Sequence, residues 1–389
     1  MIANTQLLAH APLGPSAAEG WATCADYVNA NRGLPDEPTY AAAEGTFAHE
    51  VSEMCFDLGG EPKDFIGYHN TVELWQFEWS AEDAELLHPG IARVRSLGGH
   101  FFGEHRVDIS PWTIEGQFGT LDRAIVTDEA IYINDLKWGR YPVYAFYNRQ
   151  LVLYALGFWN KHAKYMTQTK KFILEIDQPR CAGGGGTWET TLDELLRYGE
   201  WLRKRAEATQ QPNPPRTASE KGCQWCKRRK APGGCDTYDS FIASLMQDMF
   251  DDEDAPSDPV LRRSFLLEHK QMVLNYFEML AEQELDDYRS GKPTPGRKLV
   301  YDGRRGTRDK WTSESKAKEV LEKLLGPKAF KPPSLVTPKQ ALDKVSPEDI
   351  VKVEPLITPG EKGTVMVSEA DVRPAIPVID FEEEDENGL

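Results

Sequence analysis

The spacing of hydrophobic positions divides the first part of the chain into strand-like and helix-like segments. Apolar residues that alternate with polar ones or run together, as in half-buried or fully buried strands, occur at 101–109, 113–127, 130–137 and 170–180. Apolar residues spaced three and four apart, the period of one helix face, occur within 13–60, 143–162 and 192–210. Strands followed by a helix and another strand, with a helix in front, predict an α/β core built on a mixed sheet.

The pattern changes after residue 247, where a run of acidic residues begins. Beyond this run, the chain predicts a long amphipathic helix at 259–291, a hairpin at 298–311 and a short helix at 313–326. We therefore expect an α/β domain at 1–247, an acidic linker at 248–259, a small α+β unit at 260–375 and a disordered acidic tail at 376–389.

Composition limits the classes of protein to which the chain can belong. Of its 389 residues 40% are hydrophobic, enough for an ordinary core, and no apolar run reaches the roughly eighteen residues of a spanning helix. The N-terminal sequence lacks the basic and then apolar order of a signal peptide. Six cysteines, three of them close together, suit a metal centre in a reducing compartment better than a disulfide framework. We therefore expect a soluble protein in the cytoplasm.

The formal net charge of -17 argues at first against a nucleic-acid partner, because such partners usually require a basic surface. However, the acidic residues are concentrated at 248–259 and 379–389, whereas basic residues gather at 227–230 and 291–310. Each basic run is either a solvated surface or a contact for a polyanion. The charge balance alone therefore leaves a nucleic-acid partner open.

Two charged residues at the end of an apolar strand give the first indication of chemistry. Asp135 and Lys137 share one face of the predicted strand at 130–137, while Leu136 points to the other face. Charges on a buried strand are costly unless they are paired or hold a metal. Together with Asp122 on the preceding strand, they offer two carboxylates for a magnesium ion and an amine beside it. An ion pair at a sheet edge has the same pattern, so Asp-x-Lys alone is a weak signal.

The neighbouring residues make this pattern more specific. Gly45-Thr46-Phe47-Ala48-His49 precedes Asp122 and Asp135-Leu136-Lys137, and Gln150-x-x-x-Tyr154 follows them. This order, within residues 20–237, resembles the RecB-like branch of the PD-(D/E)XK nucleases, which includes the AddB and CRISPR adaptation nucleases. The resemblance implies a restriction-endonuclease-like core in which His49, Asp122 and Asp135 bind Mg²⁺ or Mn²⁺ and Lys137 is catalytic. It also implies that Gln150 and Tyr154 contact DNA or tune the site.

Each of these residues also has a purely structural interpretation. His49 could be an ordinary histidine on a helix, and Tyr147 and Tyr154 lie on an apolar stripe that normally belongs to a core. Gln150 is harder to explain in this way, because an amide that faces a core needs hydrogen-bond partners. Glu104 either adds a further acid to the site or pairs with Arg106, and it ranks below the other candidates.

The cysteines indicate a second metal centre. Cys223, Cys226 and Cys235 form C-x-x-C followed by a third cysteine, and a four-thiolate site needs one more ligand, which Cys24 can supply. Iron-sulfur members of the RecB-like branch likewise have one cysteine before the nuclease motifs and three after them, so the resemblance implies a [4Fe-4S] cluster. Four cysteines also suit structural zinc, which the spacing does not exclude.

The remaining two cysteines, Cys55 and Cys181, are interpreted as ordinary residues. The basic residues after Cys226 would lie on a loop fixed by the cluster, where we expect them to contact DNA phosphates; they are Lys227, Arg228, Arg229 and Lys230. The basic segment at 297–310 either guides a DNA strand or is a solvated turn.

Two functions follow from these patterns. The first is a metal-dependent DNA exonuclease that acts on DNA ends in phage recombination or replication. The second is a catalytically silent DNA-binding or assembly protein with the same fold. Every catalytic position is present, which favours the enzyme. The chain, including 176–180, also resembles a phage-associated RecB-like family with a C-terminal extension. Its acidic tail resembles those of single-strand-binding proteins, so phage single-strand-binding or recombination proteins are the expected partners besides DNA.

Overall fold

The computed structural model describes residues 11–36, 38–250, 258–302, 310–312, 314–331, 334–335, 337–342, 344–346, 348–358, 363–368 and 375–376. The chain forms two compact units, Met1–Arg263 and Ser264–Leu389. The predicted acidic linker falls mainly on residues 251–257, and the predicted tail falls on 377–389; both segments lie outside the described residues. Within the described ranges, no helix is both long enough and apolar enough to cross a membrane.

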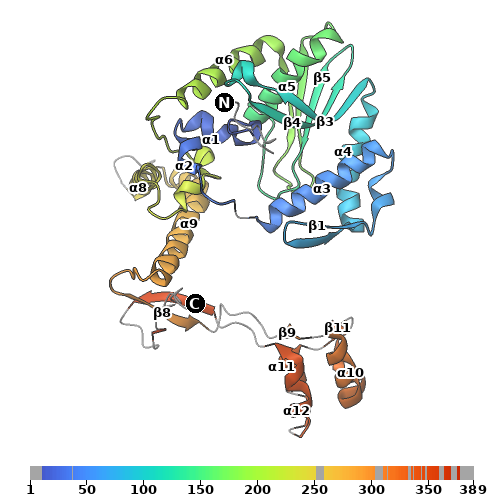
Figure 1. Cartoon of the computed structure of the whole chain (residues 1–389), viewed down its shortest axis with the longest axis vertical. Coiled ribbons are helices and arrows are strands. Elements are labelled where there is room, and N and C mark those ends of the chain that lie inside the picture. The colour runs from blue at the N-terminus through green and yellow to red at the C-terminus, as the bar shows by residue number, and fades with distance from the viewer. Residues whose placement is uncertain are drawn as a thin grey trace, which may run out of the picture. The chain divides into compact units, whose positions relative to one another are not determined.

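A five-stranded mixed sheet forms the centre of the first unit (Figure 1). Its strands follow chain order and are β3 (His100–Asp108), β4 (Phe118–Val126), β5 (Ile131–Leu136), β6 (Lys171–Asp177) and β7 (Gly186–Thr191). Neighbouring strands are antiparallel, except that β5 and β6 are parallel and are joined by a helical crossover. The predicted α/β core with a mixed central sheet flanked by helices is confirmed, and it is compatible with a restriction-endonuclease-like core.

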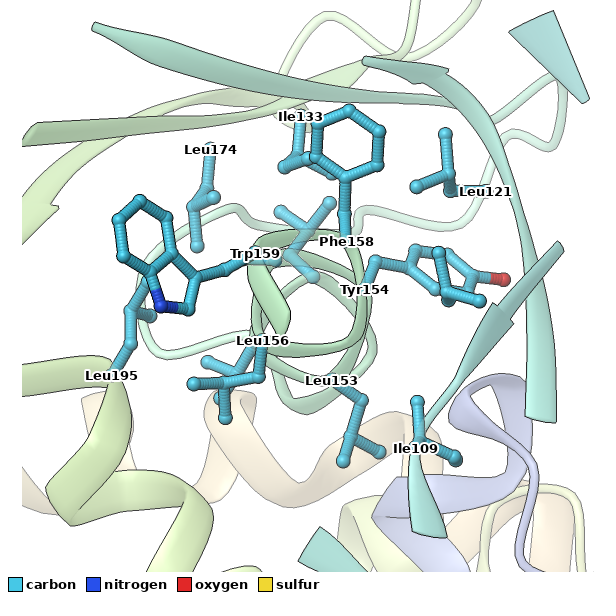
Figure 2. Packing of buried hydrophobic residues seen from close by; sticks show 14 of the residues in the cluster. Ile109, Leu121, Ile133, Leu153, Tyr154, Leu156, Phe158, Trp159, Leu174 and Leu195 are labelled. Atoms are coloured by element: carbon cyan, nitrogen blue, oxygen red, sulfur yellow. The ribbon is translucent and has the colours of Figure 1, made fainter. Parts of the chain in front are cut away.

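One face of the sheet is covered by α1 (Ala18–Thr23), α5 (Arg149–Lys161) and α6 (Leu192–Ala208) (Figure 1). Figure 2 shows side chains of α5 among those of the sheet, including Leu153, Phe158, Ile133 and Leu174. A Cβ atom at Gly157 would lie 2.9 Å from the carbonyl oxygen of Asp108. Glycine at this position therefore allows α5 to approach the end of β3 closely.

The other face is covered by α3 (Tyr40–Asp57) and α4 (Ala81–Ser96), with a hairpin of β1 (His69–Val72) and β2 (Trp75–Glu78) beside them. Thr39 caps α3, and Ser80 and Asp83 form a capping box that begins α4. The packed side chains on this face include Phe47, Val51, Leu87, Ile91 and Leu136. Leu136 thus lies on the face opposite Asp135, as the alternation along β5 requires.

Several predicted boundaries in the first unit were wrong. Residues 113–117 are not part of a strand, because a 3-10 helix at Ser110–Trp112 and a turn precede β4. The helical pattern within 13–60 is divided among three helices: residues 24–26 separate α1 from α2 (Tyr27–Asn31), and a segment that contains Pro35 and Pro38 separates α2 from α3. Tyr147 lies before α5 rather than on it, with a φ of 50°. The Asn148 side chain accepts a hydrogen bond from the Leu151 amide and begins the helix.

The cysteine segment consists of short elements next to α1 and α2. These are α7 (Glu220–Cys223), a 3-10 helix at Lys227–Arg229 and α8 (Asp236–Phe250). A Cβ atom at Gly222 would lie 2.8 Å from Thr23, so α7 packs directly against the end of α1. Arg205 of α6 donates to the carbonyl oxygens of Ala22 and Thr23, which also fixes this end of α1.

The second unit begins within α9 (Pro259–Arg289), and its strand pairing differs from the predicted hairpin at 298–311. Strand β8 (Arg297–Asp302) pairs with β13 (Gly363–Ser368), and β9 (Lys310–Trp311) pairs with β12 (Ile357–Thr358). The predicted turn between β8 and β9 falls on 303–309, outside the described residues. The other elements of this unit are α10 (Glu314–Leu325), β10 (Phe330–Lys331), β11 (Ser334–Leu335), α11 (Pro338–Leu342) and α12 (Ile350–Val353).

Candidate active site

The candidate site lies where β4 and β5 separate. Their last paired residues are Arg123 and Asn134, and the next residue on each strand, Asp122 and Asp135, is an acid. The backbone amide of Leu136 donates to Oδ2 of Asp122 at 2.7 Å, in place of a ladder hydrogen bond to β4. Because the two strands separate here, there is space for both acids, and the Leu136 amide fixes the position of Asp122.

Glu104 lies on β3 opposite Asp122, between the paired positions Gly103 with Arg123 and His105 with Leu121. Its φ of 39° places a residue with a bulky side chain in the left-handed region in the middle of a strand. Such strained positions persist only where the surrounding structure enforces them, and they cluster at functional sites. This backbone conformation is a local feature of the site that the sequence does not reveal.

Three side chains converge at this point from three elements. One ligand atom each from His49 of α3, Glu104 of β3 and Asp122 of β4 all lie within 4.8 Å of one another. Nδ1 of His49 is 3.5 Å from Oδ2 of Asp122. In the part of the chain that the structure describes, no other group of three or more His, Cys, Asp or Glu side chains is this tight. Carboxylate and imidazole ligands suit manganese, and carboxylates suit magnesium.

A second set of side chains lies on the α5 side of β5. Lys137 Nζ is 2.6 Å from Oδ2 of Asp135 and donates to Oε1 of Gln150 at 3.1 Å. The Gln150 amide donates to Oδ1 of Asp135 at 3.0 Å and to the Tyr154 hydroxyl at 3.1 Å. Gln150 therefore links the acid, the lysine and the phenol, and its amide has the partners that a position on a buried helix face requires.

Burial and charge act in opposite directions on the ion pair. Asp135 is only 1% exposed; burial raises its pKa, Lys137 opposes this shift and the nearby Asp122 adds to it. Burial alone would lower the pKa of Lys137, but the attraction of Asp135 and Asp122 outweighs burial, so its pKa is raised. Burial also raises the pKa of Tyr154, and the charge of Asp135 adds to the effect. Lys137 thus remains a cation and Tyr154 remains a neutral phenol.

Glu104 is exposed as a whole residue, but protein atoms and other acids surround its carboxylate. Burial raises the pKa of Glu104 to about 7, and the charges of Asp122 and Glu53 contribute further. In the metal-free protein this carboxyl therefore keeps its proton well above the ordinary value of 4.5. A cation bound beside it would remove this repulsion.

The shift at Glu104 predicts a pH effect on stability. Because the folded pKa exceeds the unfolded value, the stabilisation is present at low pH and is lost as pH rises from 4.5 to about 7. In EDTA, we expect Glu104→Gln to flatten the fall in thermal stability over this window, as measured by circular dichroism melts. The matched control is Glu115→Gln, whose carboxyl lies in the turn before β4. Equal pH slopes in Glu104→Gln and wild type would contradict the prediction.

Two of the three predicted metal ligands, His49 and Asp122, lie together, and the role of Asp135 as a ligand stays a prediction. The third member within 4.8 Å is Glu104, whereas both oxygens of Asp135 face Lys137 and Gln150. The alternative pairing of Glu104 with Arg106 is not observed. The Arg106 guanidinium lies over the Phe118 ring, 3.5 Å from its centroid.

Gln178, which sequence reasoning did not single out, fixes the loop that follows Lys137. Its amide donates to the carbonyl oxygens of Gly139 and Tyr141 at 2.8 and 2.7 Å, and its Oε1 accepts from the Val143 amide at 2.9 Å. Gln178 is almost fully buried. A glutamine within the apolar strand predicted at 170–180 was the available signal, because an amide that faces a core needs several partners.

The four predicted cluster cysteines come from the end of α1 and the segment around α7. Burial raises the pKa of Cys223 to about 11, and the thiols of Cys226, Cys24 and Cys235 contribute to the rise. The side-chain amide of Asn31 donates to Sγ of Cys226 at 3.4 Å. The four thiols are therefore electrostatic neighbours. Cys55 lies apart on the buried face of α3, and Cys181 lies in the loop after β6.

The predicted DNA-binding residues after Cys226 are partly used within the protein. The Lys227 ammonium pairs with Asp36 at 2.5 Å, and its backbone amide donates to Asn31. Arg229 donates to the Gln224 carbonyl oxygen at 2.6 Å. Nε of Arg228 is buried without a hydrogen bond among the described residues. Lys227 and Arg229 thus fix the cysteine loop, and the more exposed Lys230 follows them.

A mixed sheet flanked by helices, with acids, a histidine and a lysine gathered where two strands separate, defines an α/β protein with a candidate metal site. The chain belongs to the family described as "Protein of unknown function (DUF2800)", which matches residues 10–374. A crystal structure of a candidate exonuclease from Eubacterium rectale is similar at 13% identity and a TM-score of 0.32, covering 55% of this chain and 86% of that chain. The crystal structure of SSO0001 is similar at 16% identity and a TM-score of 0.26, covering 56% and 86%.

Proposed function

We propose that the protein is a metal-dependent deoxyribonuclease of the RecB-like PD-(D/E)XK type that hydrolyses phosphodiester bonds at DNA ends. The observation that carries the proposal is the meeting of two sets of side chains where β4 and β5 separate. One set is His49, Glu104 and Asp122, and the other is Asp135 and Lys137 with Gln150. Phosphodiester hydrolysis requires a metal ion that activates water and a positive charge that stabilises the phosphate, and the two sets provide ligands for the ion and the charged amine.

The residues present fit Mg²⁺ or Mn²⁺. His49, Glu104 and Asp122 would hold the ion, and Asp135 lies beside them on the adjoining strand. Burial raises the pKa of Glu104 most, the charges of Asp122 and Glu53 add to it, and Arg123 offsets it only in part, so a further cation would be favoured at this group of acids. When bound, such an ion polarises a phosphate oxygen and lowers the pKa of a coordinated water.

The chain's own residues would orient the substrate and stabilise charge. Lys137, held by Asp135 and Gln150, would donate to a phosphate oxygen as negative charge grows in the transition state. Gln150 fixes the orientation of both charged groups. The Tyr154 hydroxyl accepts a hydrogen bond from Gln150. Because its pKa is raised, the hydroxyl stays protonated and remains a hydrogen-bond donor beside the acids.

We also propose that Cys24, Cys223, Cys226 and Cys235 hold a [4Fe-4S] cluster and close the domain at 1–247. Their mutual electrostatic effects support a shared centre. Four cysteines also suit a structural zinc ion, which stays the alternative for this centre. Phage recombination or replication, with phage partner proteins, stays a prediction of the sequence.

Exonuclease action can be tested with matched DNA molecules. The full-length protein, prepared without oxygen, is incubated with linear DNA and with covalently closed circular DNA of the same sequence, in Mg²⁺ or Mn²⁺. The proposal predicts nucleotide release from linear DNA and none from closed circles. Cutting of both would identify an endonuclease. Cutting of neither, with both DNAs bound, would favour the catalytically silent DNA-binding protein.

A further inference from the structure

A continuous group of aromatic rings lies beside α5, outside the residues assigned to catalysis. We call it the aromatic strip; its members are Phe146, Tyr147, Trp188, Tyr198 and Trp201. Tyr147 stacks on Trp188 with ring centroids 4.7 Å apart, and it also contacts Phe146 and Tyr198 at 4.7 and 5.7 Å. Tyr198 contacts Trp201 at 5.5 Å. Each ring therefore touches the next across β7, α6 and the loop before α5.

Much of this aromatic surface is open to solvent. Phe146 is 69% exposed, Tyr147 is 46% exposed and Trp201 is 40% exposed, while Trp188 is buried beneath them. Tyr141 and Tyr144 of the same loop are also more than half exposed. Large apolar groups that gather on a surface commonly mark a binding site.

The strip is held in place rather than loosely arranged. Tyr147 has a left-handed backbone with a φ of 50°, which is costly for an aromatic residue. Its hydroxyl donates to Glu194 at 2.8 Å, and the Tyr198 hydroxyl donates to its carbonyl oxygen at 3.2 Å. These contacts keep the rings in fixed positions, so binding there would cost little side-chain entropy.

The strip is continuous with the proposed active site. Tyr147 directly precedes Asn148, which caps α5, and Gln150 on the first turn of α5 bonds to Lys137. The Gln178 amide donates hydrogen bonds to the loop that runs from Lys137 to the aromatic strip and so fixes this loop. The Arg149 guanidinium lies 5.2 Å from the Trp201 ring centroid, where its pairing with Glu19 at 3.2 Å fixes it beside the ring.

We propose that the aromatic strip binds the unpaired bases of a single DNA strand whose backbone leads into the site at Lys137. This inference rests on the proposed nuclease function and narrows its substrate class. Exposed aromatic faces stack on bases of any sequence, because every base has a flat face. Bases within a duplex are already stacked on both faces, so only a single-stranded segment offers them to the strip.

The test measures DNA binding separately from cleavage. All variants are made in the full-length Lys137→Ala protein, so the DNA stays intact. Phe146→Ala and Trp201→Ala remove exposed rings, and Tyr147 is left unchanged because its contacts hold the loop. The matched control is Tyr165→Ala, a ring that is 77% exposed beyond the far end of α5, about 20 Å away along a helix of this length. Fluorescence anisotropy is measured with labelled oligothymidylate and with a blunt duplex of equal length.

We expect each strip variant to weaken oligothymidylate binding roughly tenfold, the size of a lost base-aromatic contact, with duplex binding and the control unchanged. Unchanged oligothymidylate affinity in both strip variants would overturn the inference, as would an equal loss for the duplex. If Lys137→Ala protein binds no DNA, the inference falls. If wild-type protein then still cleaves linear DNA, the nuclease proposal stands without the strip; if it neither binds nor cleaves DNA, both fail.

Discussion

Asp135→Asn is expected to reduce DNA cleavage by at least roughly a hundredfold to a thousandfold, the usual cost of removing a group that stabilises the transition state. Asparagine keeps the shape of the side chain but removes the charge that holds Lys137 at 2.6 Å. Asp122→Asn should have a similar effect, because Asp122 shares the metal group with His49 and Glu104. Cleavage is measured as nucleotide release from end-labelled DNA, and circular dichroism checks that both variants remain folded.

The chain offers a control with the same change in charge. Asp128 lies exposed in the turn between β4 and β5, at the opposite end of their paired segment from Asp122 and Asp135. Asp128→Asn should therefore cleave like wild type. Lys137→Ala should lose cleavage as well, but it should still bind Mn²⁺ in calorimetry, since Lys137 contacts none of the three converging ligands. If Asp135→Asn, Asp122→Asn and Lys137→Ala all cleave DNA as fast as wild type, these residues do not form the active site.

The second large effect is expected at the cysteines. If Cys24, Cys223, Cys226 and Cys235 hold iron and sulfur, protein purified without oxygen should be brown and contain about four irons per chain. Serine at any of these positions should remove the colour and lower the melting temperature. The reason is that metal-binding energy contributes to folding, and the centre would join the end of α1 to the segment around α7. Absorbance, iron analysis and thermal melts measure these effects.

The control for this series is Cys181→Ser. Cys181 lies in a loop, so the variant protein should stay brown. Cys55 is less suitable, because it is fully buried in an apolar cluster and a serine hydroxyl there has its own cost. Asp135→Asn should stay brown while losing activity, which separates the two centres. Colourless protein with one zinc per chain would instead establish the zinc alternative and leave the nuclease proposal intact.

Local patterns in the sequence predicted the elements that carry the site. Alternation along β5 placed Asp135 and Lys137 on one face and Leu136 on the other, and the structure has them so. The apolar stripe around Gln150 and Tyr154 predicted α5, which begins at Arg149. These features depend only on residues close together in the chain. The spacing of hydrophobic residues therefore predicts them without knowledge of the fold.

Features that depend on distant or strained backbone could not be predicted in this way. Nothing near Glu104 shows that its φ would be 39° or that β4 would place Asp122 opposite it. The pairing of β8 with β13 joins residues 61 to 71 positions apart, whereas the local pattern favoured a hairpin. Tyr147 fitted the helical stripe by spacing, but the Asn148 cap begins α5 after it. In each case a tertiary or capping contact outweighed the local period.

The most direct test of the central claim compares wild-type and Lys137→Ala protein on end-labelled linear DNA, with Mg²⁺, Mn²⁺ or EDTA. The account predicts nucleotide release by wild type in Mg²⁺ or Mn²⁺, none in EDTA, and none by Lys137→Ala under any condition. Release that persists in EDTA, or that is equal in the two proteins, would show that the side chains gathered at β4 and β5 do not form a metal-dependent nuclease site.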